Sequence, residues 1–261
     1  MSFELKDFSL DMFSLKGKVA IVTGGNTGMG QGLAVALAKA GADVLVHHHS
    51  NKNIEETREL IESCGSKVKF VQANLEDPNC ADKIIGECVK EFGTVDILVN
   101  NAGTIRRAPL TEYKKEDWEA VINVNLNSLY YLSQAAAAIM VKKNSGKIIN
   151  VASMLSFQGG KFVPAYTASK HAVAGLTKAF ANELAPHNIQ INAIAPGYIS
   201  TANTKAIRED ETRSDEILSR IPAARWGVPY DIMGAGVFLA SHASDYMNGH
   251  IIAIDGGWLV R

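Results

Sequence analysis

Short apolar runs alternate with longer helical patterns along almost the whole chain, and this alternation restricts the possible folds more than any other feature. The runs predicted as strands are 18–23, 43–48, 67–73, 95–100, 146–152, 189–195 and 251–254. The helical patterns between them include 28–40, 53–64, 78–92, 115–142 and 164–185. Most of the runs are apolar throughout, as is typical of parallel strands that helices cover on both faces. The sequence therefore predicts an α/β fold in a single domain, 1–261, with a doubly wound parallel sheet of about seven strands and helices on both faces.

Composition and charge exclude several classes of partner. The 261 residues are 47% hydrophobic, which is enough for one sizeable core, and the net charge of −1 shows no basic excess. We therefore expect no nucleic-acid partner and no anionic membrane surface. No apolar run approaches the roughly 20 residues that span a bilayer. The three cysteines, an odd number without C-x-x-C spacing, indicate reduced thiols in a cytoplasmic protein.

Two segments stand outside the alternating pattern. Residues 1–15 mix charged and apolar side chains without the uninterrupted apolar stretch of a signal peptide, so we expect a short N-terminal arm. The segment 196–214 is polar, charged and the least regular part of the chain. A loop of this kind beyond the carboxyl end of a strand is typical of a substrate lid, which we expect within 196–228.

A glycine-rich turn follows the first predicted strand. It reads Thr23-Gly24-Gly25-Asn26-Thr27-Gly28-Met29-Gly30, with the spacing G-x-x-x-G-x-G. Gly24 permits a tight turn, and Gly28 and Gly30 let the backbone approach a pyrophosphate at the helix N-terminus. Such a turn also occurs without a ligand. At the first strand–helix junction of a βαβ series, however, it predicts a Rossmann-type dinucleotide site formed by Gly24, Asn26, Thr27, Gly28, Met29 and Gly30.

The end of the second predicted strand bears on the choice of cofactor. His47-His48-His49-Ser50 stands where a carboxylate would accept bonds from the adenosine ribose. No Arg or Lys for a 2′-phosphate is present there either, and Lys52 lies beyond the expected position. The missing basic residue favours NAD(H) without excluding NADP(H). Because neighbouring strand residues point to opposite faces, the three histidines cannot bind one metal ion, and we expect no metal site.

Tyr166 and Lys170 are four residues apart in a predicted helix, so their side chains share a face. Tyrosine has a reference pKa of about 10, and a nearby ammonium would lower that pKa by stabilising the phenolate. Tyr166 could then take a proton from an alcohol or return it to a ketone. Ser153 ends the preceding predicted strand, where its hydroxyl could orient the substrate oxygen. Tyr–Lys pairs are often mere surface neighbours, but the glycine turn and Ser153 make an active site the favoured interpretation.

With these motifs in this order, the chain resembles the short-chain dehydrogenase/reductase family over nearly its whole length. The matching residues are 23–30, Asn100-Asn101-Ala102-Gly103, Asn125 within Asn123-Val124-Asn125-Leu126, Ser153, Tyr166, Lys170, Pro196-Gly197 and Thr201. The resemblance implies an NAD(P)-dependent oxidoreductase that acts on CH–OH groups. It implies catalytic roles for Tyr166, Lys170, Ser153 and Asn125, where Asn125 kinks its helix and holds a water that relays protons to Lys170.

The resemblance also implies the contacts of the cofactor. Asn101, Ala102 and Gly103 would line the adenosine side, Tyr166 and Lys170 would approach the nicotinamide ribose, and Pro196, Gly197, Ile199 and Thr201 would contact the nicotinamide. Two departures from the family pattern concern cofactor preference rather than chemistry. Asn74, followed by Leu75, stands where the family often has Asp near the adenine, and His48 stands where its NAD-users often have Asp. These three residues complete the cofactor candidates.

Several segments resemble one group within the family, the 2-dehydro-3-deoxy-D-gluconate 5-dehydrogenases and 2-deoxy-D-gluconate 3-dehydrogenases. They are 103–107, 147–160, 195–199, 216–218, 220–223, 225–227 and 255–259. The resemblance implies a small-molecule sugar-acid substrate from the breakdown of uronate polysaccharides such as pectin or glycosaminoglycans. A substrate of this kind needs a cation for its carboxylate and several hydrogen-bond partners.

The candidate substrate residues lie after the predicted strands. Arg106 or Arg107 could meet the carboxylate, although either could be a solvated loop charge. Lys161 could supply the cation instead, and Arg225 is a weaker candidate because it could bridge to a structural acid. The hydroxyls could meet Ser153, Ser156, Gln158 and Asn203.

Other activities stay open at this point. A gluconate 5-dehydrogenase would share these motifs, whereas a 3-ketoacyl-carrier-protein reductase would prefer NADPH and show basic residues that 25–27 and 47–49 lack. A non-catalytic dinucleotide sensor would tend to lose the tyrosine or the lysine. The family resemblance implies a homotetramer, in which a neighbouring subunit could cover the apolar tail Trp258-Leu259-Val260; burial within its own subunit is the alternative.

Overall fold

The computed structural model describes residues 5–261, and within them seven strands form one parallel sheet in the order β3-β2-β1-β4-β5-β6-β7. The strands are β1 (Val19–Thr23), β2 (Asp43–His48), β3 (Val68–Gln72), β4 (Ile97–Asn100), β5 (Gly146–Val151), β6 (Ile189–Pro196) and β7 (Ile251–Ile254). The predicted doubly wound sheet is therefore confirmed. The predicted bounds of the strands are right to within two residues.

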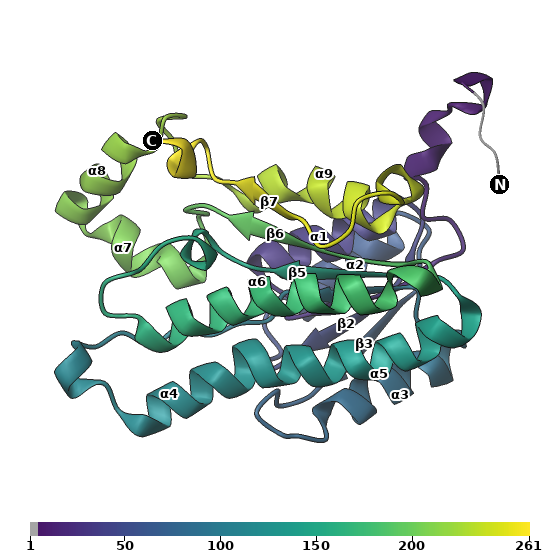
Figure 1. Ribbon diagram of the computed structural model, residues 1–261, viewed down its shortest axis with the longest axis horizontal. Helices are drawn as coiled ribbons and strands as arrows, with labels where there is room; N and C mark the ends of the chain where they lie inside the picture. The colour runs from purple at the N-terminus through teal and green to yellow at the C-terminus, as the bar shows by residue number, and fades with distance from the viewer. Residues whose placement is uncertain (1–4) are drawn as a thin grey trace.

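Helices cover both faces of this sheet. They are α1 (Gly28–Lys39), α2 (Ile54–Glu62), α3 (Cys80–Phe92), α4 (Lys115–Ile122), α5 (Ser128–Lys143), α6 (Pro164–Leu184), α7 (Lys205–Glu209), α8 (Glu211–Arg220) and α9 (Pro229–Ala240). Figure 1 shows α9 above β5 and β6, and α6 and α5 below them. One core cluster lies under α1, α2 and α9, and a second lies under α3, α5 and α6. Because both faces are covered, β1 is buried along its whole length.

Two segments differ from the sequence prediction. The helix expected over 115–142 is interrupted by a π-helical turn, Asn123–Asn127, between α4 and α5. The segment expected to be irregular, 196–214, contains α7 and the beginning of α8. Asp210 caps α8 by accepting a bond from the Arg213 backbone N–H at 3.0 Å, and Ile217 is buried against the body of the protein. This single apolar contact is hard to recognise in the sequence because the segment is rich in charged residues.

The sheet order reverses between β1 and β4, and the turns after these two strands meet there. The Asn101 side-chain amide donates to the carbonyls of Thr23 and Gly24 at 2.9 and 3.3 Å. The backbone N–H groups of Asn101 and Ala102 both donate to Thr23 Oγ1 at 3.0 Å. In an open α/β sheet, the crevice at such a reversal is where ligands bind. None of the helices in residues 5–261 has the length and apolarity that a membrane crossing needs.

Candidate active site

The glycine turn forms a cradle suited to a phosphate group. Thr27, the residue before α1, makes no side-chain cap, so the first backbone N–H groups of α1 are left for another acceptor. Gly28 has a φ of 55°, which favours glycine. A Cβ atom at Gly30 would lie 2.0 Å from the Gly24 carbonyl oxygen, so a side chain there would break the turn. Free N–H groups and a helix N-terminus favour an anion, and a dinucleotide pyrophosphate fits these residues.

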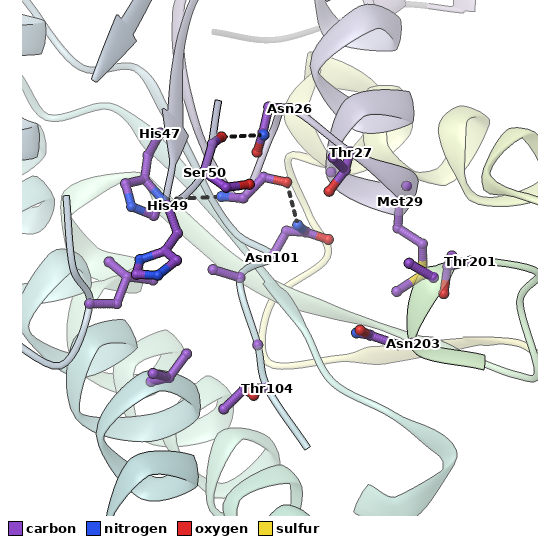
Figure 2. Close-up of a pocket in the computed structure, with 18 of the residues that line it drawn as sticks. Asn26, Thr27, Met29, His47, His49, Ser50, Asn101, Thr104, Thr201 and Asn203 are labelled. Atoms are coloured by element: carbon purple, nitrogen blue, oxygen red, sulfur yellow. Dashed lines mark hydrogen bonds between the residues drawn. The ribbon is translucent and has the colours of Figure 1, made fainter. Parts of the chain in front are cut away.

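The cavity at this turn contains most of the residues predicted to bind the cofactor (Figure 2). Its lining includes Gly24, Asn26, Thr27, Gly28, Met29, Gly30, Asn74, Leu75, Asn101, Ala102, Gly103 and Thr201. The side-chain amide of Asn26 donates to the carbonyls of Ser50 and Lys52 at 3.0 and 2.8 Å. The chain after β2 is thereby tied to the glycine turn.

The histidine run after β2 does not lie as expected. His48 is buried on the other side, with its ring edge-on to Phe70, and it does not line the cavity. His47 and His49 line it instead (Figure 2). Successive strand residues face opposite ways. The family pattern therefore points to the right part of the chain, the end of β2, but His47 and His49 reach the cavity and His48 does not. Within residues 5–261 no group of three or more His, Cys, Asp or Glu could hold a metal ion.

His47 is bonded on both ring nitrogens. Nδ1 accepts from the Gly24 backbone N–H at 3.2 Å, and Nε2 lies 3.2 Å from the Ala73 carbonyl oxygen. The carbonyl of His47 also accepts from Gly25 N–H at 3.0 Å. Burial lowers the pKa of His47 to about 4, so its ring is neutral at physiological pH.

Ser153, Tyr166 and Lys170 come together at the carboxyl ends of β5 and β6, as predicted. A hydrogen bond with Ser153 joins its hydroxyl to the Tyr166 phenol, and Ser153 Oγ also accepts from Leu155 N–H at 3.1 Å. Lys170 Nζ lies 5.6 Å from the centre of the Tyr166 ring. It donates to the Val151 carbonyl at 2.6 Å.

The pKa of Tyr166 shifts in the direction opposite to the one that the sequence predicts. Burial raises this pKa, while the hydrogen bond to Ser153 and the charge of Arg107 lower it by less. Burial also lowers the pKa of Lys170 to about 8. The spacing of Tyr166 and Lys170 predicts their proximity but cannot show that both are buried, and desolvation disfavours the charged form of each.

Asn125 lies in the π-helical turn and is buried. Its Oδ1 accepts from Thr104 N–H at 2.8 Å, and its Nδ2 donates to the Thr104 carbonyl and to Ser169 Oγ at 3.0 and 3.2 Å. The break in the helix that the family resemblance implies is therefore present. Asn125 fastens the segment after β4 to α6, the helix that carries Tyr166 and Lys170.

A second cavity of about 930 Å³ lies over Tyr166 and adjoins the first. Pro196, Gly197 and Ile199, predicted to contact the nicotinamide, line it together with Ser153 and Lys170. The two cavities share a wall, which consists of Met29, Asn101, Gly103, Thr104, Thr201 and Asn203. A dinucleotide lying across this wall would place its nicotinamide end in the cavity that contains Tyr166.

The structure separates the two candidate arginines. Arg107 lines the cavity over Tyr166, and no carboxylate within residues 5–261 forms an ion pair with it. Arg106 lines the other cavity and has partners of its own, since its Nε lies 3.4 Å from Asp117 and its Nη1 donates to Thr104. Arg107 therefore remains available for a substrate anion.

The other substrate candidates divide in the same way. Gln158, Lys161 and Asn203 line the cavity over Tyr166. Ser156 does not line it, because its buried hydroxyl donates to the Lys170 carbonyl at 2.7 Å. Arg225 makes two bonds of 2.8 Å to the Asp231 carboxylate, which is the structural bridge considered as its alternative.

Several lining residues were missed from the sequence. Tyr198, Arg213, Glu216, Arg220 and Trp258 line the cavity over Tyr166. Tyr198 packs edge-on against Trp258 at 4.9 Å between ring centres, and the Arg220 guanidinium lies 4.1 Å above the Trp258 ring. Buried Trp258 thus packs within its own subunit, whereas Val260 is 88% exposed. The signal in the sequence was the position of Tyr198 directly after Pro196-Gly197.

Comparison with known proteins agrees with this geometry. The sequence profile of a family described as Enoyl-(Acyl carrier protein) reductase matches residues 24–259. A 2-dehydro-3-deoxy-D-gluconate 5-dehydrogenase of Bacillus subtilis is 58% identical over 251 residues, which are 96% of this chain and 98% of that protein.

Solved structures agree as well. A protein of Agrobacterium tumefaciens, proposed to be a 2-deoxy-D-gluconate 3-dehydrogenase and solved with bound NADP, is 49% identical, with a TM-score of 0.89 over 95% of this chain and 99% of that one. A gluconate 5-dehydrogenase of Burkholderia cenocepacia, in complex with NADP and tartrate, is 36% identical, with a TM-score of 0.92 over 97% and 100% of the two chains.

These matches cover the glycine turn, both cavities and the group formed by Ser153, Tyr166 and Lys170. The group is complete, and it lies beside a cradle that fits a dinucleotide. The chain belongs to the short-chain dehydrogenase/reductase family, and it is a nicotinamide-dependent oxidoreductase.

Proposed function

We propose that this enzyme interconverts a hydroxyl and a ketone on a sugar acid, 2-dehydro-3-deoxy-D-gluconate and its 5-keto form, in uronate catabolism. The observation that carries the proposal is Arg107, a cation without a carboxylate partner among residues 5–261, on the wall of the cavity over Tyr166. Lys161, Gln158 and Asn203 add polar groups to the same wall. An acid with several hydroxyls matches such a surface, and the names of the relatives point to this class of substrate.

The side chains divide the work of the reaction. Pro196, Gly197 and Ile199 would hold a nicotinamide in this cavity, where it would supply the hydride for reduction of the ketone or accept it in oxidation of the alcohol. Tyr166 donates its proton to the ketone oxygen, and the raised pKa of the phenol keeps that proton in place at neutral pH. Ser153 orients the substrate oxygen through the same hydroxyl that bonds the phenol. When Tyr166 loses its proton it becomes a phenolate, and the ammonium of Lys170 stabilises that negative charge. Arg107 holds the carboxylate away from the reacting carbon.

A substrate panel with purified protein tests the proposal. The panel contains 2-dehydro-3-deoxygluconate for oxidation, and its 5-keto form, 5-ketogluconate and acetoacetyl thioester for reduction. We expect kcat/KM for the first two to exceed that for the thioester by at least about 100-fold, since the thioester lacks a group to pair with Arg107. Preferred turnover of 5-ketogluconate would assign the enzyme to the gluconate dehydrogenases. Preferred turnover of the thioester would overturn the sugar-acid proposal.

We infer that both NAD(H) and NADP(H) serve as cofactor. The lack of Arg or Lys in 47–50 favours NAD(H), but 47–53 also contains no carboxylate that would repel a 2′-phosphate. Two of the related structures hold NADP. We expect KM values for NADH and NADPH that differ by less than about tenfold, measured with one sugar acid at saturation. A difference of about 100-fold or more would contradict dual use.

We propose that 196–228 forms the substrate lid of a single domain, 1–261. The side chains of Ile207, Arg213, Glu216 and Arg220 from this segment reach the cavity over Tyr166.

The first residues of the proposed N-terminal arm, 1–4, lie outside the described residues. In 5–15, Leu15 joins the core and its N–H donates to the Ala40 carbonyl at 2.7 Å.

We propose further that the enzyme is a cytoplasmic homotetramer. Trp118 on α4 and Tyr130 and Tyr131 on α5 are each about two-fifths exposed, as expected for aromatic residues that another subunit covers. Light scattering on the purified protein tests this, and a monomer at micromolar concentration would contradict it.

A further inference from the structure

We propose that His47 is a positioning residue for the cofactor, because its imidazole joins the two walls between which the dinucleotide lies. One ring nitrogen holds the glycine turn through Gly24, and the other reaches the end of β3 at Ala73. Asn74 and Leu75, which follow Ala73 directly, line the same cavity. The inference rests on dinucleotide binding by the family and not on the sugar-acid substrate.

The hydrogen bonds fix the state of the ring. The Gly24 backbone N–H can only donate, so Nδ1 must be unprotonated, and the Ala73 carbonyl can only accept, so Nε2 must carry the proton. An imidazolium would direct an N–H against the Gly24 N–H. The neutral ring with its proton on Nε2 is therefore the single form that makes both bonds.

His47 acts on the part of the turn that sets the phosphate cradle. Gly24 N–H is held by His47 Nδ1, Gly25 N–H by the His47 carbonyl, and the Gly24 carbonyl by Asn101. The Gly24 carbonyl in turn lies against Gly30, where no side chain fits. Fixing Gly24 thus fixes the first turn of α1, whose free N–H groups meet the pyrophosphate.

The position of His47 argues against a purely structural role. A histidine that is 1% exposed carries a desolvation cost that an apolar residue at this strand end would avoid. The buried residues before it in β2, Val44, Leu45 and Val46, are apolar. Of the two buried polar residues in β2, His47 and His48, only His47 lines the cofactor cavity.

Three substitutions separate the two bonds. His47→Asn retains an acceptor near the position of Nδ1, His47→Gln retains a donor near the position of Nε2, and His47→Leu removes both. The dissociation constants of NADH and NADPH, from the fluorescence of the bound nucleotide, need no substrate. Hydrogen exchange of the Gly24 amide in the protein without cofactor gives a second measurement that is independent of activity.

We expect His47→Gln, which loses the bond to Gly24, to weaken binding of both nucleotides about tenfold and to speed exchange at Gly24 by a similar factor. His47→Leu, which loses both bonds, should weaken binding at least as much. His47→Asn should keep most of the wild-type affinity for the nucleotides and most of the wild-type protection of the Gly24 amide. In these variants kcat at saturating cofactor should change by less than about threefold. Equal affinities in His47→Asn and His47→Gln, at equal thermal midpoints, would overturn the proposal. A loss of kcat with unchanged affinity would do the same. Failure of the sugar-acid proposal would leave these measurements unaffected.

Discussion

The cofactor side and the substrate side of this site are built in different ways. On the cofactor side, backbone atoms and short polar side chains at strand ends hold one another, as Asn101 and His47 hold Gly24. On the substrate side, long charged side chains come from loops and from helices outside the sheet. Arg213, for example, lies on α8, is about half exposed, and pairs with Glu216 of its own helix. The sheet thus holds the residues of the proposed cofactor site, whereas the residues proposed to set substrate specificity lie outside the sheet.

The substitution with the largest expected effect should slow the chemical step without weakening the binding of either ligand. We expect Tyr166→Phe to lower kcat by about a thousandfold, because it removes the proton donor. The dissociation constant of NADPH should stay within about twofold, since the glycine turn is untouched. Single-turnover rates and nucleotide fluorescence measure the two quantities. If the variant kept a tenth of the wild-type rate, the role of Tyr166 would be refuted.

Arg107 tests the substrate side alone. Arg107→Gln should raise KM for the sugar acid about 10- to 100-fold, corresponding to about 1.5–3 kcal/mol for a lost bond to a charged group. Arg106→Gln is the matched comparison, because its guanidinium already pairs with Asp117. It should alter that KM less. Equal effects of the two variants would place the carboxylate elsewhere in the cavity.

A pair of glycine substitutions tests how tightly the cofactor side is held. Gly30→Ala should lower the free energy of unfolding by about 1–3 kcal/mol and weaken nucleotide binding, because the new Cβ meets backbone at 2.0 Å. In exposed Gly86, on α3, an added Cβ meets nothing within 4 Å, so Gly86→Ala should raise stability by about 1 kcal/mol. Chemical denaturation compares them. A stable Gly30→Ala protein with normal affinity would show that the turn adapts.

The smallest effect concerns stability against pH. The pKa of His47 is lowered to about 4 in the folded protein, chiefly by burial, with smaller effects of His48, His49 and Lys83. The unfolded chain therefore binds more protons, and the contribution of His47 should be lost as pH falls from about 6.5 toward about 4. In His47→Asn this part of the pH dependence should be missing. If the free energies of unfolding of the two proteins changed equally with pH across that range, this pH dependence could not be assigned to His47.

The fold could be read from the sequence because β-rich apolar runs and helical patterns alternate over nearly the whole chain. Local motifs also placed Gly24, Gly30 and Asn101, since their roles depend on backbone geometry next to a strand. The sequence prediction placed His48 in the cofactor cavity, whereas His47 and His49 line it. A shift of one residue along a strand reverses the face to which a side chain points.

The substrate side was less predictable for a different reason. Arg106 and Arg107 are adjacent, and only the position of Asp117 on α4 shows which of them already has a partner. The helix α8 was missed because its buried face consists of little more than Ile217. The pKa direction of Tyr166 depends on burial, which spacing along a helix does not reveal.

The wall common to the two cavities has a thermodynamic consequence. Met29, Thr201 and Asn203 present atoms to both spaces, so a ligand in one space changes the surface that the other ligand meets. Linkage then requires reciprocity: the factor by which a bound nucleotide alters affinity for the sugar acid equals the factor by which the sugar acid alters affinity for the nucleotide. A substitution in that wall changes both factors together, whichever ligand it was designed to affect.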